Sequence, residues 1–192
     1  MKLKCLFASV AVASALFSGG AMAADGTINF IGNITANACT VTGAAQSGNV
    51  VNTSTTITMP NVSVGALSAV GVFSGHTPFS IHLTNCEATE ELSNVYTAFT
   101  TTNPAVSDTS VMANTQTDGS GATGIGLAIL NGDSFTQIDL NGGSNRDTVR
   151  MLPVAGSPGP MQLDYVAVYK VLALPVTPGG VTGQVSYTLA YN

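Results

Sequence analysis

The chain has 192 residues, of which 45% are apolar and only 8% are charged, with ten acidic residues against five Lys and Arg. So few cations cannot neutralise a run of phosphates, which excludes nucleic acid as a partner and disfavours anionic membrane surfaces. The composition is too apolar for a disordered chain, and it favours an exported β-protein whose surface carries hydroxyl groups rather than charges.

The first 23 residues have the pattern of a secretory signal peptide. Lys2 and Lys4 precede an apolar stretch, Leu6–Phe17, which is too short to span a bilayer, and Ala21-Met22-Ala23 fits the small-x-small rule for cleavage. We therefore expect a mature chain of residues 24–192 that forms a single domain.

Two cysteines remain after this cleavage, because Cys5 leaves with the signal peptide. Cys39 and Cys86 are then the only possible intramolecular pair, in a compartment that oxidises thiols. A disulfide is predicted, and closing a loop of about 48 residues stabilises a fold by about 4 kcal/mol in the chain-entropy model. The alternative is a pair of free thiols.

Alternation of apolar and polar residues recurs along the mature chain, as is typical of half-buried strands. The first run, residues 26–34, places Ile28, Phe30 and Ile34 on one face. Four later runs have the same pattern: 79–83, 125–129, 163–171 and 185–191.

Turn clusters rich in Gly, Asn, Asp and Pro separate these runs. The segment Pro153–Pro160 holds three prolines and two glycines, so it is predicted to be a connection rather than a strand. Short strands with regular turns predict an all-β sandwich, and neither a linker nor a repeat divides it.

Residues that could carry catalysis, a metal or a cofactor are scarce. His76 and His82 are the only imidazoles, and two histidines six residues apart without a nearby carboxylate make a poor metal site. Gly119, Gly121 and Gly124 match G-x-G-x-x-G, but a strand rather than a helix is predicted to follow them. We therefore expect no enzyme activity, no cofactor and no metal.

Both ends of the mature chain are strand-like. The last apolar side chains, Leu189 and Tyr191, have to be paired or buried, whereas the N-terminal run is free at one end. A free strand can pair with the exposed sheet edge of another molecule, which is the binding mode called β-augmentation.

Four segments resemble the pilin subunits of fimbriae that are built by the chaperone-usher route. Residues 26–39 resemble the family's G-T-[VI]-x-F-x-G run into its first cysteine, and 78–86 resemble the strand that carries the second cysteine. Residues 122–130 are similar to a strand in the family's second half, and Gly179 and Tyr191 match the glycine and tyrosine that mark family C-termini.

This resemblance implies an incomplete immunoglobulin-like sandwich that lacks its last strand and is completed by donor-strand complementation. A periplasmic pilus chaperone would lend a strand first, and the next subunit's N-terminal segment would replace it at the outer-membrane usher. The function implied is that of a structural subunit of a surface fimbria, exported through the periplasm, that polymerises with neighbouring subunits and supports cell adhesion.

The resemblance also assigns residues to these roles. The N-terminal donor strand is residues 24–32, and the sandwich is 33–192. The donor face comprises Ala24, Gly26, Ile28, Phe30 and Gly32, and the contacts to a chaperone or subunit comprise Gly179, Leu189 and Tyr191.

Three alternatives stay open. Ile28 and Phe30 would lie in the first strand of a closed sandwich if the chain donated no strand. A tip or adaptor adhesin that binds a host glycan is the second, although the chain has no Trp and no length for a separate lectin domain. A small secreted hydrolase is the third, and it lacks an evident catalytic base.

Overall fold

The structure, a computed structural model, describes residues 38–46, 51–116, 118–143 and 145–192. In this part the chain forms strands and loops with one short 3-10 turn, Val64–Ala66. The strands are β1 (Thr40–Gln46), β2 (Phe73–Cys86), β3 (Asn94–Thr100), β4 (Pro104–Ala105), β5 (Asp108–Ala113), β6 (Ile125–Asn131), β7 (Gln137–Ile138), β8 (Arg150–Met151), β9 (Gly159–Val171) and β10 (Ser186–Tyr191). No helix in the described ranges is long and apolar enough to cross a membrane.

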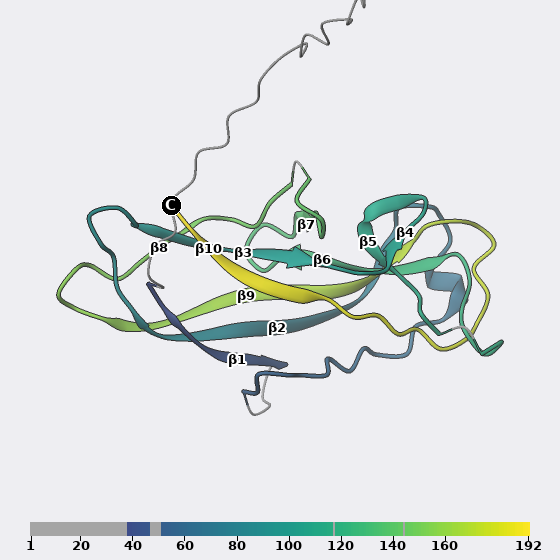
Figure 1. Cartoon of the computed structure of the whole chain (residues 1–192). Coiled ribbons are helices and arrows are strands. Elements are labelled where there is room, and N and C mark those ends of the chain that lie inside the picture. Colours follow the sequence, from purple (N-terminus) through teal and green to yellow (C-terminus); the bar gives the residue numbers. More distant parts are fainter. Residues whose placement is uncertain (1–37, 47–50, 117, 144) are drawn as a thin grey trace, which may run out of the picture. The chain divides into compact units, whose positions relative to one another are not determined.

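Two antiparallel sheets form the sandwich (Figure 1). The larger sheet has the order β1-β2-β9-β6-β5-β4, with β7 paired to β6, and the smaller sheet has the order β10-β3-β8. The long ladder between β2 and β9 places Phe73 opposite Lys170 and Cys86 opposite Gly159. The all-β sandwich predicted from the alternation is confirmed.

The core lies between the two sheets, and the alternation in β2 explains how it forms. Phe79, Ile81 and Leu83 point inward and are at most 9% exposed, whereas Ser80 and His82 lie on the opposite face of the strand. Both sheets contribute to this cluster, which includes Val95, Phe99, Ile129, Leu163 and Tyr165.

The four later strands predicted from the sequence are confirmed as parts of β2, β6, β9 and β10. The connection predicted at 153–160 was too long, because β9 already begins at Gly159. Pro160 is tolerated there since the ladder with β2 is irregular between Met161 and Gly159, so a missing N–H breaks no regular pair.

The Cys39–Cys86 disulfide is present, and both residues are buried. It joins the residue just before β1 to the last residue of β2, so it fixes one end of the edge strand β1 to the end of the neighbouring strand.

Candidate functional site: a groove between two strand edges

A groove runs between two sheet edges that have no neighbouring strand in the described part of the chain. β10 lies at the edge of the smaller sheet and β1 at the edge of the larger one. A single bridge, between Ala44 and Asn52, continues beyond β1. A cavity of about 450 Å³ opens between the two edges, and Ala44 and Tyr187 both line it.

The backbone of β10 offers hydrogen-bonding groups to this groove. Asn192 and Asn94 exchange N–H to carbonyl bonds of 3.2 and 2.9 Å, so this pair is of the hydrogen-bonded kind. In an antiparallel ladder such pairs alternate, and Tyr187, Leu189 and Tyr191 therefore direct their backbone groups away from β3. These three residues form the free edge.

The facing wall is an extended segment, residues 53–59, that follows β1. From Thr55 on, its odd-numbered residues are partly buried and the even-numbered ones exposed, and Ile57 packs against the core. The side chain of Gln46 holds this wall: its amide donates to the Thr58 carbonyl at 3.1 Å and accepts from the Thr58 N–H at 2.9 Å.

Because the backbone of Thr58 is turned toward Gln46, its neighbours Ile57 and Met59 direct their backbone groups to the other side. Neither residue makes a backbone hydrogen bond within the described residues, and both line the cavity. Two free strand edges thus face each other across an apolar floor, whose lining includes Phe79, Ile81, Phe99, Leu127 and Ile129.

Two tyrosines of β10 stand at the groove. Partial burial raises the pKa of Tyr187. Burial also raises the pKa of Tyr191, an effect that a hydrogen bond from the Cys39 backbone partly opposes. Tyr191 therefore lies near the disulfide, at the end of the groove where β1 begins.

The predicted site residues fall into two groups. The donor residues Ala24, Gly26, Ile28, Phe30 and Gly32 lie outside the described residues. Leu189 and Tyr191 lie on β10 and pack against the core at the free edge.

Gly179 lies in the loop between β9 and β10, and it does not line the cavity. A Cβ atom there would stand 2.4 Å from the Ala122 nitrogen and 2.5 Å from the Ser120 oxygen. This close approach of two loops requires glycine on its own account, and a chaperone contact at Gly179 stays a prediction.

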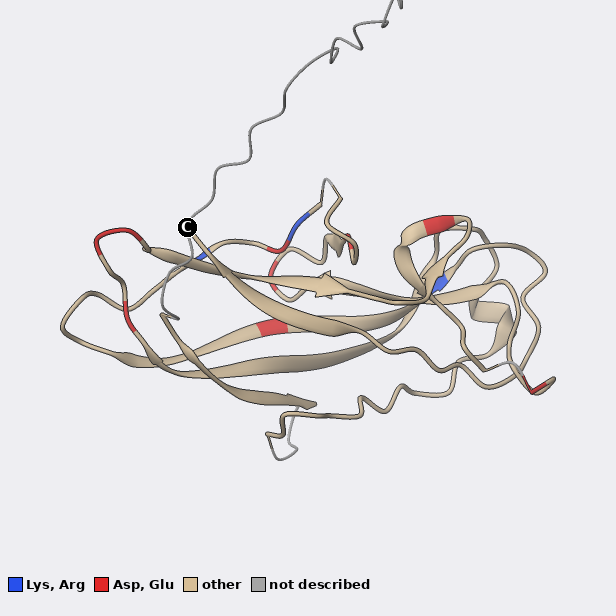
Figure 2. Cartoon of the chain, in the orientation of Figure 1, with Lys and Arg blue, Asp and Glu red and all other residues tan. Residues whose placement is uncertain are grey.

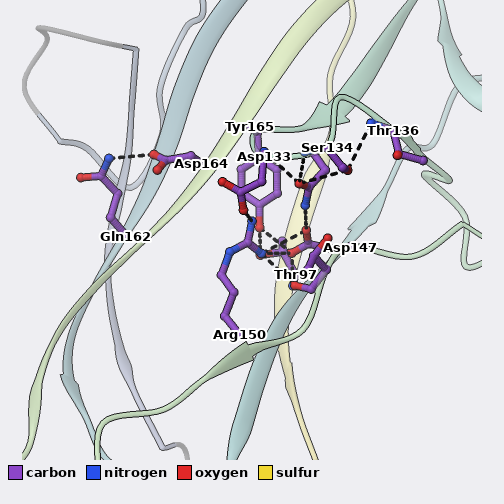
Figure 3. A network of polar contacts seen from close by, with 11 residues as sticks. Thr97, Asp133, Ser134, Thr136, Asp147, Arg150, Gln162, Asp164 and Tyr165 are labelled. Carbon is purple, nitrogen blue, oxygen red and sulfur yellow. Dashed lines mark hydrogen bonds and ion pairs between the residues drawn. The ribbon is translucent and has the colours of Figure 1, made fainter.

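A buried polar network, which the sequence did not reveal, lies on the side of β3 that faces away from β10 (Figure 3). The Asp147 side chain is fully buried and accepts hydrogen bonds from the Thr97 N–H at 2.9 Å and the Tyr165 hydroxyl at 2.6 Å. Asn131 donates to it at 3.0 Å, and Arg150 forms an ion pair with it at 3.1 Å.

This network replaces a missing strand partner. The N–H of Thr97 points away from β10, toward the side where β8 pairs only with Asn94 and Val95. Asp147 satisfies that N–H and so closes the β3 edge. Burial, with the nearby Asp147 carboxylate, raises the pKa of Tyr165 far above its ordinary value, so the phenol stays a donor.

Groups for catalysis do not come together in the described residues. The ring of His82 is hydrogen-bonded to Ser80 at 2.9 Å, but the Asp164 carboxylate accepts from Gln162 instead of from the imidazole. No group of three or more metal-ligating side chains is found among the residues that the structure describes. The arrangement is suited to pairing with a strand.

Comparison with known proteins identifies the fold family. The family described as fimbrial protein matches residues 28–192. The chain belongs to this family. The fimbrial subunit is 34% identical over 173 residues to the major fimbrial subunit SMF-1 of Stenotrophomonas maltophilia, covering 90% of this chain and 95% of that protein. It is 32% identical over 193 residues to the F17 fimbrial protein of Escherichia coli, covering 100% and 99% of the two chains.

Among solved structures, the P pilus rod subunit PapA superposes with a TM-score of 0.57 at 20% identity, over 81% of this chain and all of that one. This likeness confirms the immunoglobulin-like pilin fold. The fimbrial subunit is a structural protein of a surface pilus and not an enzyme, as the resemblance implied.

Proposed function

We propose that the fimbrial subunit polymerises by donor-strand exchange, with residues 24–32 of one copy filling the groove of the next. The observation that carries the proposal is the pair of free strand edges, β10 and residues 53–59, over an apolar cavity. An inserted strand would satisfy backbone groups on both sides and bury its alternate side chains between them.

The donor roles follow from the two-residue period of a strand. Ile28 and Phe30 are the bulky residues of the donor face, and burial of each contributes roughly 1.5–3 kcal/mol. Gly26 contributes through the absence of a side chain where the strand passes closely over the groove. Ala24 and Gly32 complete the face.

Two further partners belong to this proposal. In the periplasm a pilus chaperone would occupy the groove before assembly and contact Gly179, Leu189 and Tyr191, the last two of which lie at the free edge. An outer-membrane usher would then exchange that strand for the next subunit's donor. After removal of residues 1–23 the chain would follow this route to the cell surface.

The names of the relatives favour a shaft role over a tip adhesin. SMF-1 is described as a major fimbrial subunit, and PapA as a rod subunit. Electron microscopy of cells that lack this chain provides the test: loss of all filaments is expected for a shaft subunit, and loss of adhesion alone would contradict that role.

The exchange itself is tested with chaperone-bound variants mixed with usher. Gly26→Val and Phe30→Asp are expected to block polymer growth, and Asn29→Asp, on the opposite face, serves as the matched control. All three should still bind chaperone, because the chaperone occupies the groove rather than the donor. Normal polymers from both donor-face variants would contradict the proposal.

A mixing experiment separates donation from acceptance. Phe30→Asp leaves the groove intact, so this variant is expected to accept a wild-type donor strand. It can occupy only one position in the polymer, namely the end subunit whose own donor strand fills no groove. Because a variant subunit can start a polymer but cannot extend one, mixtures with wild type should give shorter polymers that contain at most one variant subunit each. Variant subunits throughout the polymer would contradict the assignment.

A further inference from the structure

A second cavity lies on the outer face of the larger sheet, apart from the groove. Its volume is about 550 Å³, within the range of roughly 300–1,000 Å³ that is typical of small-molecule sites. Ser80 and His82 line it, and on β2 these residues alternate with Ile81 and Leu83, which are buried in the core. A strand inserted between the two sheets would therefore leave this cavity, here called the outer cavity, open.

The floor of the outer cavity carries two pairs of polar side chains. The register of β2 with β9 places Ser80 opposite Asp164 and His82 opposite Gln162. Ser80 Oγ is hydrogen-bonded to His82 Nε2 at 2.9 Å, and Gln162 donates to one oxygen of Asp164 at 2.7 Å (Figure 3). The second carboxylate oxygen, the Gln162 side-chain carbonyl and the other imidazole nitrogen have no hydrogen bond within the described residues, so they are available to a ligand.

One wall of the outer cavity is an exposed aromatic ring in an unusual backbone conformation. Phe135 is 58% exposed, and its φ of 55° is one that a bulky residue rarely adopts. Its N–H donates to the carbonyl of the buried Asn131 at 3.0 Å, and Asn131 is itself bound to Asp147. The Gly132 N–H donates to the Asp164 carbonyl at 2.9 Å. The turn thus holds the ring beside Asp164, and such backbone strain is concentrated at ligand sites.

The groups that line the outer cavity favour an uncharged ligand with many hydroxyl groups. No Lys or Arg is found among the described residues that line it, so an anion has no counter-ion there. Asp164, the only acidic residue of β9 (Figure 2), accepts from hydroxyl groups, and the neighbouring amide and imidazole can both donate and accept. The face of an aromatic ring is negative and attracts the slightly positive hydrogens of C–H groups. A sugar ring has hydroxyl groups at its rim and C–H groups on its faces.

We propose that the outer cavity binds one neutral sugar ring of a surface glycan, with the ring stacked on Phe135 and its hydroxyl groups bonded to Asp164, Gln162 and His82. This activity is additional to assembly, because none of these four residues lines the groove. It also differs from that of a tip adhesin, since every subunit carries the site. Only its multivalency rests on the proposed polymerisation: a fibre presents many copies of a weak site, and linked sites bind far more tightly than one.

Saturation-transfer NMR tests the single site without a polymer. The mature subunit, as purified from the periplasm, is mixed with the methyl glycosides of glucose, galactose, mannose and N-acetylglucosamine, and with N-acetylneuraminic acid as the anionic control. At least one neutral glycoside should receive saturation, most strongly at the C–H protons of one ring face. Phe135→Ala should abolish this signal, and Phe135→Tyr, which keeps the ring, should retain it. The proposal would be overturned by no transfer to any neutral glycoside, by an unchanged signal in Phe135→Ala, or by displacement with tetramethylammonium as effective as with the glycoside itself.

Fibres test the effect of repetition. Fibres composed of this chain alone are passed over beads that carry the same neutral glycosides, and Asp164→Ala is expected to lower their retention at least about tenfold. Asp133→Ala is the matched control, because Asp133 is an exposed carboxylate that does not line the outer cavity. Polymer length in electron micrographs should be the same for both variants. Equal retention of the two variants would overturn the proposal, whereas loss of polymers by the donor-face variants concerns only the proposed exchange and leaves the NMR result unaffected.

Discussion

At the scale of single residues, the centre of the sandwich depends on one carboxylate. Asp147 is fully buried, and its acceptors are used by a backbone N–H, a phenol, an amide and a guanidinium. The Arg150 guanidinium also lies over the ring of Tyr165, 5.6 Å from its centre. Removing the carboxylate would leave the Arg150 guanidinium without its buried counter-ion, and the Thr97 N–H and the Asn131 amide without their acceptor.

Asp147→Ala is therefore expected to lower the free energy of unfolding by about 3–5 kcal/mol, the range for breaking a buried ion pair on one side. Asp133→Ala is the matched control, because Asp133 is 77% exposed and 3.9 Å from Arg150. The free energy of unfolding of both variants is measured by urea titration of the chaperone-free subunit in the presence of excess peptide 24–36. Equal losses from the two variants would contradict the role of Asp147.

Tyr165 gives the network a pH dependence with a definite sign. Burial raises its pKa above the ordinary 10.0, so the folded state holds the phenolic proton more tightly than the unfolded state. This contribution is complete below pH 10 and is lost progressively as the pH rises beyond it. Tyr165→Phe should flatten the alkaline decline in unfolding free energy, and an unchanged slope above pH 10 would contradict this.

At the scale of elements, the groove depends on how its two walls are held. β10 is held by its ladder with β3, but the wall formed by residues 53–59 has no ladder in the described chain. In place of a ladder, the Gln46 side chain forms two hydrogen bonds with the Thr58 backbone, and the Thr55 hydroxyl donates to the Ala44 carbonyl at 2.6 Å. A wall held by side chains is sensitive to single substitutions.

Gln46→Ala is expected to weaken binding of peptide 24–36 at least about fivefold and up to about 150-fold, since two hydrogen bonds of about 0.5–1.5 kcal/mol each no longer order the wall. Gln162→Ala is the matched control, because Gln162 is an exposed residue of β9 that does not line the groove. Fluorescence titration of labelled peptide against both variants tests this. Equal affinities of the two variants for the peptide would contradict the role of the Gln46 hydrogen bonds in ordering the wall.

The other wall is tested by shortening β10. Truncation after Thr188 removes Leu189 and Tyr191. These are two of the three residues whose backbone groups form the free edge of β10, and their side chains pack against the core. Co-purification with the periplasmic chaperone should be lost, while Tyr191→Phe, which keeps the ring, should retain it. A truncated chain that still co-purifies at wild-type yield would place the contact elsewhere.

At the scale of the whole molecule, an open groove leaves the isolated subunit with part of its core uncovered. The Cys39–Cys86 bond then has greater importance than in a closed sandwich, because it holds β1 to the larger sheet beside the groove. Cys39→Ser should sharply lower the periplasmic yield of folded subunit. Wild-type yield of the variant, measured by immunoblot with the cytoplasmic pool as reference, would contradict this.

The sequence predicted the strands whose alternation is strict, such as Phe79 to Leu83, because one face of each is buried in the core. It also predicted the disulfide and, through resemblance, the pilin fold. It could not predict the role of Asp147, since nothing local distinguishes a buried carboxylate in a loop from an exposed one. The wall at residues 53–59 was missed for a similar reason: a Thr- and Ser-rich stretch has little apolar alternation, and its Gln46 clamp is a long-range contact.

The two edges of the groove also fix the register of an inserted strand. Tyr187, Leu189 and Tyr191 on one side, and Ile57 and Met59 on the other, present their backbone groups at every second residue. A slip of one residue in an inserted strand turns its whole apolar set outward, and it does so against both edges together. A donor that is lengthened by one residue between Ile28 and Phe30 is thus out of phase for all later positions, whereas a donor lengthened by two is back in phase.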